Sequence, residues 1–404
     1  MAKRGSNIYK RRDGRFEGRV PVGYRDNGKI KYKSVYARTL SEVKEKMAEV
    51  YSIKQNHSVS AMKLTVQTAA QQWLSSAKLR VKESSYANYE NIISKHILPF
   101  LGGEFMSNLT TSKLNDFIHY KLNNGRLNGN GGLSAKSVRD IMTVYRSIEA
   151  YAAREYGIRE THFTMPKTEK KQIDVLNAFE RKRLENYLLH NQNNTNISVL
   201  LCLFTGLRVG ELCGLNWGDI DFINGVIRVN KTLQYLQSEV DKKCRYVIQT
   251  PKTSSSIRTI PMVSQLVEIL KKHWEEQHTQ IIYLGDAWQK NGEKLLRNLV
   301  FTTRFGNPMD RNSVNRSISS IIRDLNKEGE EKAKKENSQY VPIKDFSPHC
   351  MRHSFATRCF EAGIEPKIIQ MYMGHSTLAV TMDIYTHVSE NGKKEEIKKI
   401  EKAV

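Results

Sequence analysis

The residues best suited to chemistry lie in the segment SPHCMRHSFATRCF, residues 347–360, which holds two histidines, two arginines and two cysteines. His349 and His353 are four positions apart, the spacing of two zinc ligands on one helical face, and Cys350 is nearby. Because no H-E-x-x-H glutamate and no third ligand at a familiar spacing accompanies them, a metal site is the less favoured interpretation. His349 and Arg352 also share a helical face. A guanidinium offers a planar fork of donors and an imidazole can donate or carry a proton, so this pair indicates a site for an oxyanion such as phosphate.

A second cluster lies in LLCLFTGLRVGELCGLNWGDIDF, where Arg208 precedes Glu211 by three positions. Such a pair shares a helical face, so Glu211 can orient the guanidinium. Exposed ion pairs at this spacing are common and carry little information on their own. The apolar residues on both sides of the pair, however, predict that Arg208 is partly buried.

The segment YMGHSTLAVTMDIYTHV contributes His375 and Tyr385. Taken alone, a histidine that follows a glycine is most often a helix cap, and a tyrosine in such a segment is most often a half-buried core residue. The interpretation of both residues therefore depends on the other clusters.

The elements that must position these side chains belong to a chain of 404 residues. This is longer than the roughly 250–300 residues at which one hydrophobic core stops growing, so two or three domains are expected. Residues 172–404 have a mostly helical pattern with one strand-rich interval, where GVIRVNKTLQ, CRYVIQTPKT and SIRTIPM predict a three-stranded sheet. Residues 62–165 predict a small helical domain, and the polar stretch IKQNHSVSAMK predicts a linker before it. The clearest helix starts after a serine, ends at a glycine and has these apolar positions: Val138, Ile141, Met142, Tyr145, Ile148 and Ala152.

Residues 1–57 carry 15 Lys and Arg against 6 Asp and Glu and alternate in polarity as strands do. One predicted face is cationic, and we expect it to bind a nucleic-acid groove or its phosphates. Its basic members are Arg15, Arg19, Lys29, Lys31 and Lys33. The other face is apolar, and we expect it to pack on a following helix that Thr39 or Ser41 caps. Its members are Phe16, Val20, Tyr24, Ile30, Tyr32 and Tyr36. A solvated edge-strand face is the alternative interpretation.

The composition limits the classes of partner. The chain has 64 Lys and Arg against 42 Asp and Glu, a formal charge of +22, which predicts a polyanionic partner. Nucleic acid is favoured over a membrane, because no strongly basic amphipathic helix and no apolar run of about 18 residues is present. The N-terminus MAKRGSNIYKRRDGR lacks the apolar core of a secretory signal, so we expect the cytoplasm as the location. The five cysteines form no C-x-x-C pair, so neither a disulfide framework nor a cysteine-rich zinc site is expected.

Together, these segments resemble the tyrosine recombinase family, which includes phage and conjugative-transposon integrases. TGLRVGEL resembles the first arginine box of that family, HCMRHSFAT its H-x-x-R-H box, and MGHSTLAVTMDIYTHV its tyrosine-bearing end. TPKTSSSIRTIP resembles the hairpin that carries the family's lysine. The resemblance implies a multidomain fold that is mainly α with small β-sheets. Its parts are an N-terminal three-stranded sheet plus helix for arm-type DNA (1–57), a helical SAM-like core-binding domain (62–165), and an α-rich catalytic domain with a three-stranded sheet and a C-terminal tail helix (172–404).

The resemblance also implies a role for each candidate side chain. Tyr385 would attack a DNA phosphate and form a 3′-phosphotyrosine. Arg208 and Arg352 would hold the two non-bridging oxygens, a clamp that His349 and His375 would complete. Lys252 would protonate the departing 5′-oxygen, and Glu211 would orient an arginine. Because positive donors can stabilise the charge of the pentacoordinate phosphorus, no metal ion and no other cofactor would be required.

The partners implied by the resemblance are double-stranded DNA at core-type and arm-type sites, a homo-tetramer that joins two duplexes, and an excisionase or a host DNA-bending protein. The function implied is site-specific recombination that integrates and excises a mobile element. A DNA-binding regulator or inactive relative, and a type IB topoisomerase-like strand transferase, stay open as alternatives. We expect an inserted loop within residues 280–340. The last segment, NGKKEEIKKIEKAV, predicts a helix that docks on a neighbouring protomer or on its own domain.

Overall fold

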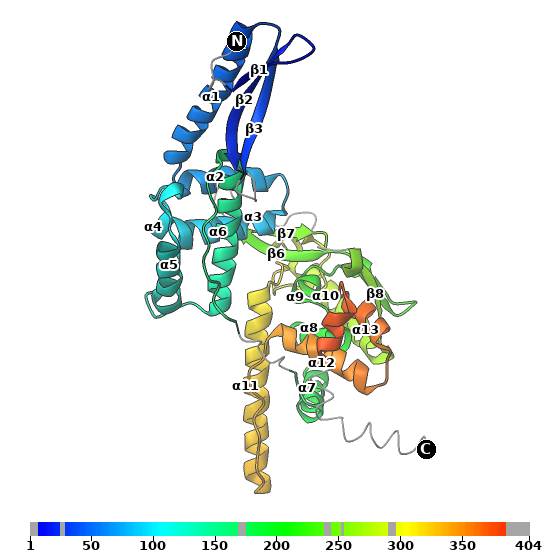
Figure 1. Ribbon diagram of the computed structural model, residues 1–404. Helices are drawn as coiled ribbons and strands as arrows, with labels where there is room; N and C mark the ends of the chain where they lie inside the picture. Colours follow the sequence, from blue (N-terminus) through cyan, green and yellow to red (C-terminus); the bar gives the residue numbers. More distant parts are fainter. Residues whose placement is uncertain are drawn as a thin grey trace, which may run out of the picture. The chain divides into compact units, whose positions relative to one another are not determined.

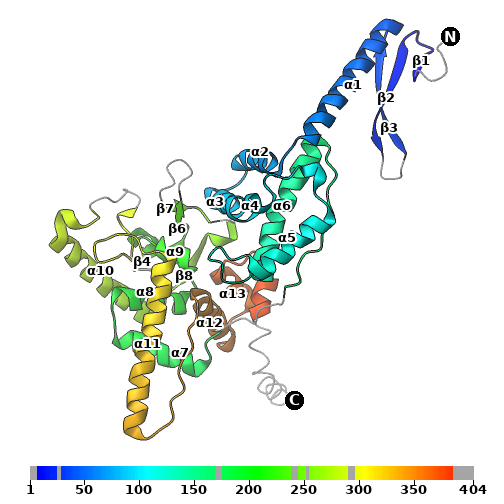
Figure 2. The same cartoon turned by 90° about the vertical axis from the view of Figure 1, so that its left-hand side faces the viewer.

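A computed structural model describes residues 7–24, 29–168, 175–237, 244–251, 254–289 and 296–384. The chain divides into two compact units, Met1–Glu169 and Lys170–Val404, and each has hydrophobic cores of its own (Figures 1 and 2). Among the described residues, no helix combines the length and the apolar character needed to cross a membrane.

The first unit begins with a three-stranded antiparallel sheet in the order β1 (Ile8–Lys10), β2 (Phe16–Tyr24) and β3 (Ile30–Ala37). Helix α1 (Leu40–Met62) runs alongside this sheet (Figures 1 and 2). Thr39 caps it, because its Oγ1 accepts a hydrogen bond of 3.3 Å from the backbone N–H of Glu42. The helix lies so close to β2 that a Cβ at Gly18 would come within 2.4 Å of Met47 Sδ. A sheet packed on one helix, as predicted, is therefore present.

The two faces of this sheet differ from the predicted faces on β3. In the register, Glu17 is opposite Tyr36 and Arg19 is opposite Ser34, whereas Val20, which is fully buried, is opposite Lys33. Residues directly opposite in an antiparallel pair share a face. Tyr36 therefore lies on the outer face, and Lys33 lies on the helix side, so the predicted assignment of faces on β3 was wrong. The small side chains of Ala37 and Val35 pair with Phe16 and Gly18 and leave room for α1, which explains the reversal.

The predicted linker is also different, because α1 continues to Met62 and includes most of it. The helical region that follows consists of α2 (Val66–Lys78), α3 (Glu83–Ile92), a π-helical turn (Ile93–Ile97), α4 (Leu98–Leu101), α5 (Thr111–Asn124) and α6 (Ala135–Tyr156). The predicted caps of α6 are confirmed. Ser134 accepts a bond from the N–H of Ser137, and Gly157 ends the helix in the left-handed region at φ 69°. All six apolar positions predicted for α6 are buried.

The second unit is built around α8 (Asn194–Thr205), on which α7 (Ala178–His190), α10 (Ser264–Leu284), α11 (Arg311–Glu336) and α12 (Pro348–Glu361) pack. Two shorter helices, α9 (Val209–Cys213) and α13 (Pro366–Met373), lie near the candidate site. Of these helices, α11 extends far from the body of the unit (Figures 1 and 2). An inserted loop was expected within residues 280–340, but helix α11 occupies much of this region. The C-terminal part of α11 has the Lys- and Glu-rich sequence KEGEEKAKKE.

The strands of the second unit form two sheets. One has the order β4 (Ile220–Asp221), β5 (Val226–Val229) and β8 (Arg258–Pro261), and the other is a hairpin of β6 (Thr232–Gln237) and β7 (Cys244–Gln249). A three-stranded sheet is therefore present, but the segment CRYVIQ pairs outside it. Asp219 explains the separation, because it accepts bonds from the side chains of Asn230 and Lys231 and so bends the chain between β5 and β6.

Candidate active site

Arg208 lies at the tight junction between α8 and α9. Helix α8 ends at Gly206, whose φ of 63° favours glycine and where a Cβ would meet Phe355 Cδ1 at 2.5 Å. Arg208 precedes the first turn of α9, and Glu211 belongs to that turn. The backbone N–H of Arg208 donates to Glu211 Oε2 at 3.0 Å, and its Nη1 donates to Oε1 at 2.8 Å. The Arg208 side chain is 35% exposed and that of Glu211 is 4% exposed, so the predicted partial burial of Arg208 is confirmed.

Arg352 lies one turn after His349 on α12 and is only 2% exposed. Its Nη1 donates to the carbonyl of Gly206 at 2.5 Å, and its Nη2 donates to the carbonyl of Met373. Burial, and then the charge of Arg208, lower the pKa of Arg352 to about 9. The guanidinium is thus still charged at neutral pH, and its two bonds fix its plane.

His375 follows α13, which ends at Gly374 with a φ of 59°. Its ring Nδ1 is 2.9 Å from Thr381 Oγ1, and both side chains are buried. Desolvation, and then the charges of Arg352 and Arg208, lower the pKa of His375 to about 3. The imidazole is therefore neutral at physiological pH and carries one N–H. If the Thr381 hydroxyl donates to Nδ1, that N–H is on Nε2 and is available to a ligand.

A cleft of about 620 Å³ opens beside Arg208 and Arg352 and is also lined by His349, Arg311 and residues of β6. The His349 ring is stacked on that of His353 at a centroid distance of 5.8 Å. Desolvation, followed by the charges of Arg352 and Arg311, lowers the pKa of His349. A neutral imidazole at the mouth of a positively charged cleft can accept a proton from a reacting group or donate one to it.

Sequence reasoning missed Arg258, which lies on β8 inside the same cluster. Its Nη1 and Nη2 donate to Glu211 Oε1 and Oε2 at 3.0 and 2.8 Å. Burial alone would raise the pKa of Glu211, but the hydrogen bonds and charge of Arg258, and then the charge of Arg208, lower it. Two guanidiniums therefore bind one carboxylate, and the charge of Glu211 also acts on Arg352. The net positive charge of this cluster favours an anion in the cleft.

The structure thus brings together Arg208, Glu211, His349, Arg352 and His375 from three separate segments. Lys252 and Tyr385 lie outside the described residues. Within the described ranges, no group of three His, Cys, Asp or Glu side chains is arranged to hold a metal ion.

Comparison with known sequences identifies the group to which this cluster belongs. A profile of the phage integrase family matches residues 167–391, more than half of the chain. The chain belongs to the phage integrase family. A second profile, the N-terminal SAM-like domain of phage integrases, matches residues 65–122 in the helical region of the first unit.

Individual relatives of this phage integrase family member are consistent with that assignment. The chain is 28% identical over 403 residues to a tyrosine recombinase XerC-like protein of Caldanaerobacter subterraneus, and the alignment covers 96% of each chain. It is 26% identical over 333 residues to the ICEBs1 integrase of Bacillus subtilis, with 81% of this chain and 80% of that one aligned.

Solved structures of a transposon integrase and of lambda integrase share its fold. The Tn1549 transposon integrase in complex with circular intermediate DNA has a TM-score of 0.63 at 23% identity, over 83% of this chain and 99% of that one. A lambda integrase tetramer bound to a Holliday junction has a TM-score of 0.50 at 17% identity, over 95% and 96% of the two chains. The predicted fold class, mainly α with small sheets, is confirmed.

The basic residues predicted on the N-terminal sheet of this phage integrase family member are mostly exposed. Arg15 pairs with Asp13 at 2.8 Å and Arg19 pairs with Glu17 at 2.9 Å. Lys29, Lys31 and Lys33 are exposed on β3 and just before it. The outer face also presents aromatic rings, because Arg19 lies over Tyr9 at 5.3 Å and Arg11 lies over Tyr36 at 5.4 Å. Sequence reasoning missed these cation–aromatic pairs, for which the alternation of tyrosines with basic residues is the available signal.

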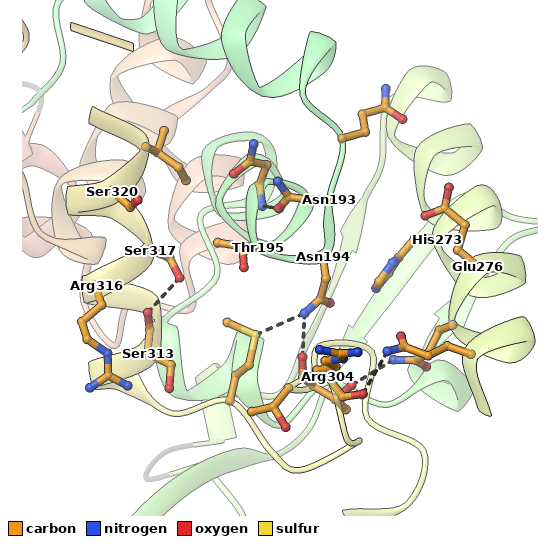
Figure 3. A pocket seen from close by; sticks show the side chains of 18 of the residues that line it. Asn193, Asn194, Thr195, His273, Glu276, Arg304, Ser313, Arg316, Ser317 and Ser320 are labelled. Atoms are coloured by element: carbon orange, nitrogen blue, oxygen red, sulfur yellow. Dashed lines mark hydrogen bonds between the residues drawn. The ribbon is translucent and has the colours of Figure 1, made fainter. Parts of the chain in front are cut away.

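The second unit, Lys170–Val404, has another and larger cleft of about 930 Å³, shown in Figure 3. Its walls are the start of α8 with Asn193 and Asn194, the serines of α11, and polar residues of α10 (Figure 3). Arg304 and Arg316 contribute positive charge to it, but Glu276 and Asp324 contribute negative charge. It contains none of the predicted catalytic residues, and its charges balance, whereas the arginines of the smaller cleft outnumber its one carboxylate, Asp310.

Proposed function

We propose that the chain is a site-specific DNA recombinase that cuts and rejoins DNA through a 3′-phosphotyrosine intermediate. In this reaction the oxygen of Tyr385 forms a bond to phosphorus while the bond from phosphorus to the 5′-oxygen breaks. The phenol loses its proton, and Lys252 supplies a proton to the departing 5′-oxygen. A 5′-hydroxyl from a second duplex then attacks the phosphotyrosine and reverses the step, so no ATP is required.

The observation that carries the proposal is the cluster at the smaller cleft. Two of the guanidiniums that line it are fixed: that of Arg352 by two backbone carbonyls, and that of Arg208 by Glu211 and a carbonyl. Negative charge develops on the non-bridging oxygens as phosphorus becomes pentacoordinate. Donors that are already fixed and charged stabilise that state more than the ground state, which is what a catalyst of phosphoryl transfer needs.

The two histidines complete this proposal. His375, neutral and positioned by Thr381, supplies an Nε2–H donor to a phosphate oxygen. His349 stands at the mouth of the cleft and is suited to proton exchange with the attacking phenol. Because positive charge near Tyr385 stabilises a phenolate, the same cluster favours loss of that proton.

The proposed partners are double-stranded DNA with core-type and arm-type sites and three further copies of this chain. Support comes from the Tn1549 integrase, whose structure contains circular intermediate DNA, and from the lambda integrase tetramer on a Holliday junction. Integration and excision of a mobile element, with an excisionase or a DNA-bending protein as accessory partner, fit the same scheme. The cytoplasm is the proposed location, which is compatible with action on DNA.

The test is to incubate the full-length protein in EDTA with a nicked duplex that carries the proposed attachment site. A recombinase forms a protein–DNA adduct that survives SDS. Tyr385→Phe should bind the duplex and form no adduct, whereas Tyr372→Phe, a matched change on α13, should form it at the normal rate. An adduct in Tyr385→Phe would assign the nucleophile to another tyrosine, and binding without any adduct would favour a DNA-binding regulator. Relaxation of supercoiled plasmids that lack the site would favour a topoisomerase.

A further inference from the structure

The Arg258 side chain donates four hydrogen bonds, more than a residue that only fills space in the core would need. Its side chain is 5% exposed. Besides its two bonds to Glu211, its Nη1 donates to the carbonyl of Ser256 at 3.1 Å and its Nε donates to the carbonyl of Tyr372 at 2.6 Å. Arg258 is absent from the residues that line the cleft, so it is placed behind the site rather than in it.

The first consequence of these contacts concerns Glu211. Each of its carboxylate oxygens accepts one bond from Arg208 and one from Arg258. A carboxylate held from two sides cannot rotate, and its orientation sets the plane of the Arg208 guanidinium. Arg208 is the more exposed of the two arginines and depends on this support for its position.

The second consequence concerns the end of α13. Arg258, Arg352 and Arg208 donate to the carbonyls of three successive residues, Tyr372, Met373 and Gly374. Carbonyls at a helix C-terminus have no partner within the helix and attract positive charge. The three arginines therefore act as a cap for α13 and fix the turn that leads to His375.

The packing at this turn leaves little freedom. A Cβ at Gly374 would lie 3.1 Å from Arg258 Cδ and 3.0 Å from the carbonyl oxygen of Ser255. The turn, β8 and the start of α9 are thus in direct contact through the Arg258 side chain.

We propose that Arg258 is a positioning residue for the recombination reaction: through Glu211 it orients Arg208, and through the Tyr372 carbonyl it places His375. The proposal rests on the proposed function. Its distinguishing feature is that Arg258 should affect the cleavage step and leave the affinity for DNA unchanged, because it does not reach the cleft.

The experiment is single-turnover cleavage of the nicked duplex by the full-length protein, with the dissociation constant and the melting temperature measured alongside. Arg258→Met should slow formation of the adduct about 100-fold, the loss expected for a small displacement of a phosphate-binding group. Its dissociation constant should be unchanged within about twofold. The matched control is Arg228→Met on the neighbouring strand β5, an exposed arginine paired with Asp221, which should cleave like the wild type.

Two further variants separate positioning from folding. Arg258→Lys keeps a positive charge beside Glu211, but its single nitrogen cannot take the place of the planar fork that binds both Glu211 oxygens and the Tyr372 carbonyl. Its melting temperature should therefore return close to that of the wild type, while its cleavage should stay at least about tenfold slower than that of the wild type. Arg258→Met leaves the buried Glu211 carboxylate with two fewer donors, and the pair Glu211→Gln/Arg258→Met also removes the charge of that carboxylate, so the pair should melt at a higher temperature than Arg258→Met and stay slow.

The outcomes are distinct. If either of these two variants regains the wild-type cleavage rate together with its stability, Arg258 is a structural residue and the inference is overturned. Wild-type cleavage in Arg258→Met would overturn it directly. Failure of the wild-type protein itself to form an adduct would contradict the proposed function instead.

Discussion

At the scale of single residues, the cluster shows how buried positive charge is stabilised inside a folded protein. The side chains of Arg352 and Arg258 are almost fully buried, and Glu211 supplies the carboxylate that pairs with Arg208 and Arg258. Backbone carbonyls supply the remaining acceptors. Since a buried charge without hydrogen bonds is costly, these carbonyls are as necessary to the site as its side chains.

The histidine in this cluster predicts a dependence of stability on pH. The pKa of His375 is about 3 in the fold against an ordinary value of 6.5. Between these values the unfolded chain binds a proton that the folded chain excludes, so the free energy of unfolding falls as pH falls through that window. From pH 7.5 to pH 5 this contribution is on the order of 2 kcal/mol.

We therefore expect His375→Gln to lose less stability than the wild type between these two pH values. Urea unfolding can be followed by tryptophan fluorescence, because three of the four tryptophans lie in Lys170–Val404. His278→Gln, at an exposed position of α10, is the control and should behave like the wild type. An unchanged pH dependence in His375→Gln would show that its ring is not held neutral by the cluster.

Most of these residues were predictable because short motifs fix them locally. Arg208 with Glu211, and His349 with Arg352, are spaced by one helical turn, so the sequence indicates that each pair shares a face. Arg258 was not predicted because its partners, Glu211 and Tyr372, are 47 and 114 residues away. The available signal was the alternation of β8, which points Arg258 to the same side as the buried Ile260.

At the scale of elements, predictions failed where tertiary packing decided between two local patterns. On β3 the aromatic residues were expected inside, but Ala37 and Val35 took that side because α1 approaches the sheet closely. The segment CRYVIQ was expected in the main sheet, but the bend that Asp219 holds directs β6 and β7 into a separate hairpin. Neither contact is visible in the local sequence.

The packing of helix α11 affects the site, because α11 begins at Arg311, which lines the smaller cleft. After α11 the chain runs back beside the helix, where Tyr340 and Ile343 contact Asn326, and then reaches His349. Gly329 lies in the C-terminal half of α11, under the ring of Tyr340. That ring is fixed, since its hydroxyl donates to Asn326 Oδ1 at 2.8 Å and Arg183 lies 4.5 Å from its centroid.

This packing predicts that Gly329→Ala destabilises the second unit, Lys170–Val404. In an open helix the change would stabilise by about 1 kcal/mol, but here the new Cβ would lie 2.0 Å from Tyr340 Cε2. We expect a melting temperature lower by a few degrees in calorimetry. Lys327→Ala on the exposed side of α11 is the control, and in a Tyr340→Ala background Gly329→Ala should no longer destabilise. A higher melting temperature for Gly329→Ala alone would show that Tyr340 does not press on the helix.

At the scale of the whole molecule, charge was the most informative property of the sequence. The formal charge is +22, and residues 1–57 hold 15 of the basic residues against 6 acidic ones. Glu17 on the sheet is neutralised by Arg11 and Arg19, so the outer face stays positive. The positive charge of residues 1–57 follows directly from the sequence, while the faces that the sheet presents depend on its register.

If the N-terminal sheet binds DNA phosphates, its basic residues set the salt dependence of that binding. Each phosphate contact releases condensed counterions, so the slope of log K against log salt changes by about 0.9 per contact. We expect the variant Arg19→Gln/Lys29→Gln/Lys31→Gln/Lys33→Gln to have a slope smaller by up to about 3.6 on arm-type DNA. Adduct formation on the core site should be unchanged, because the catalytic cluster lies in the other unit.

A matched loss of charge elsewhere distinguishes contact from general attraction. Lys327→Gln/Lys332→Gln/Lys334→Gln/Lys335→Gln removes the same four charges from the exposed side of α11. Because these lysines are not in the sheet, this control should keep the wild-type slope, measured by fluorescence anisotropy between about 50 and 200 mM salt. Equal slopes for the two variants would mean that the net charge of the chain, and not the N-terminal sheet, attracts the arm-type DNA.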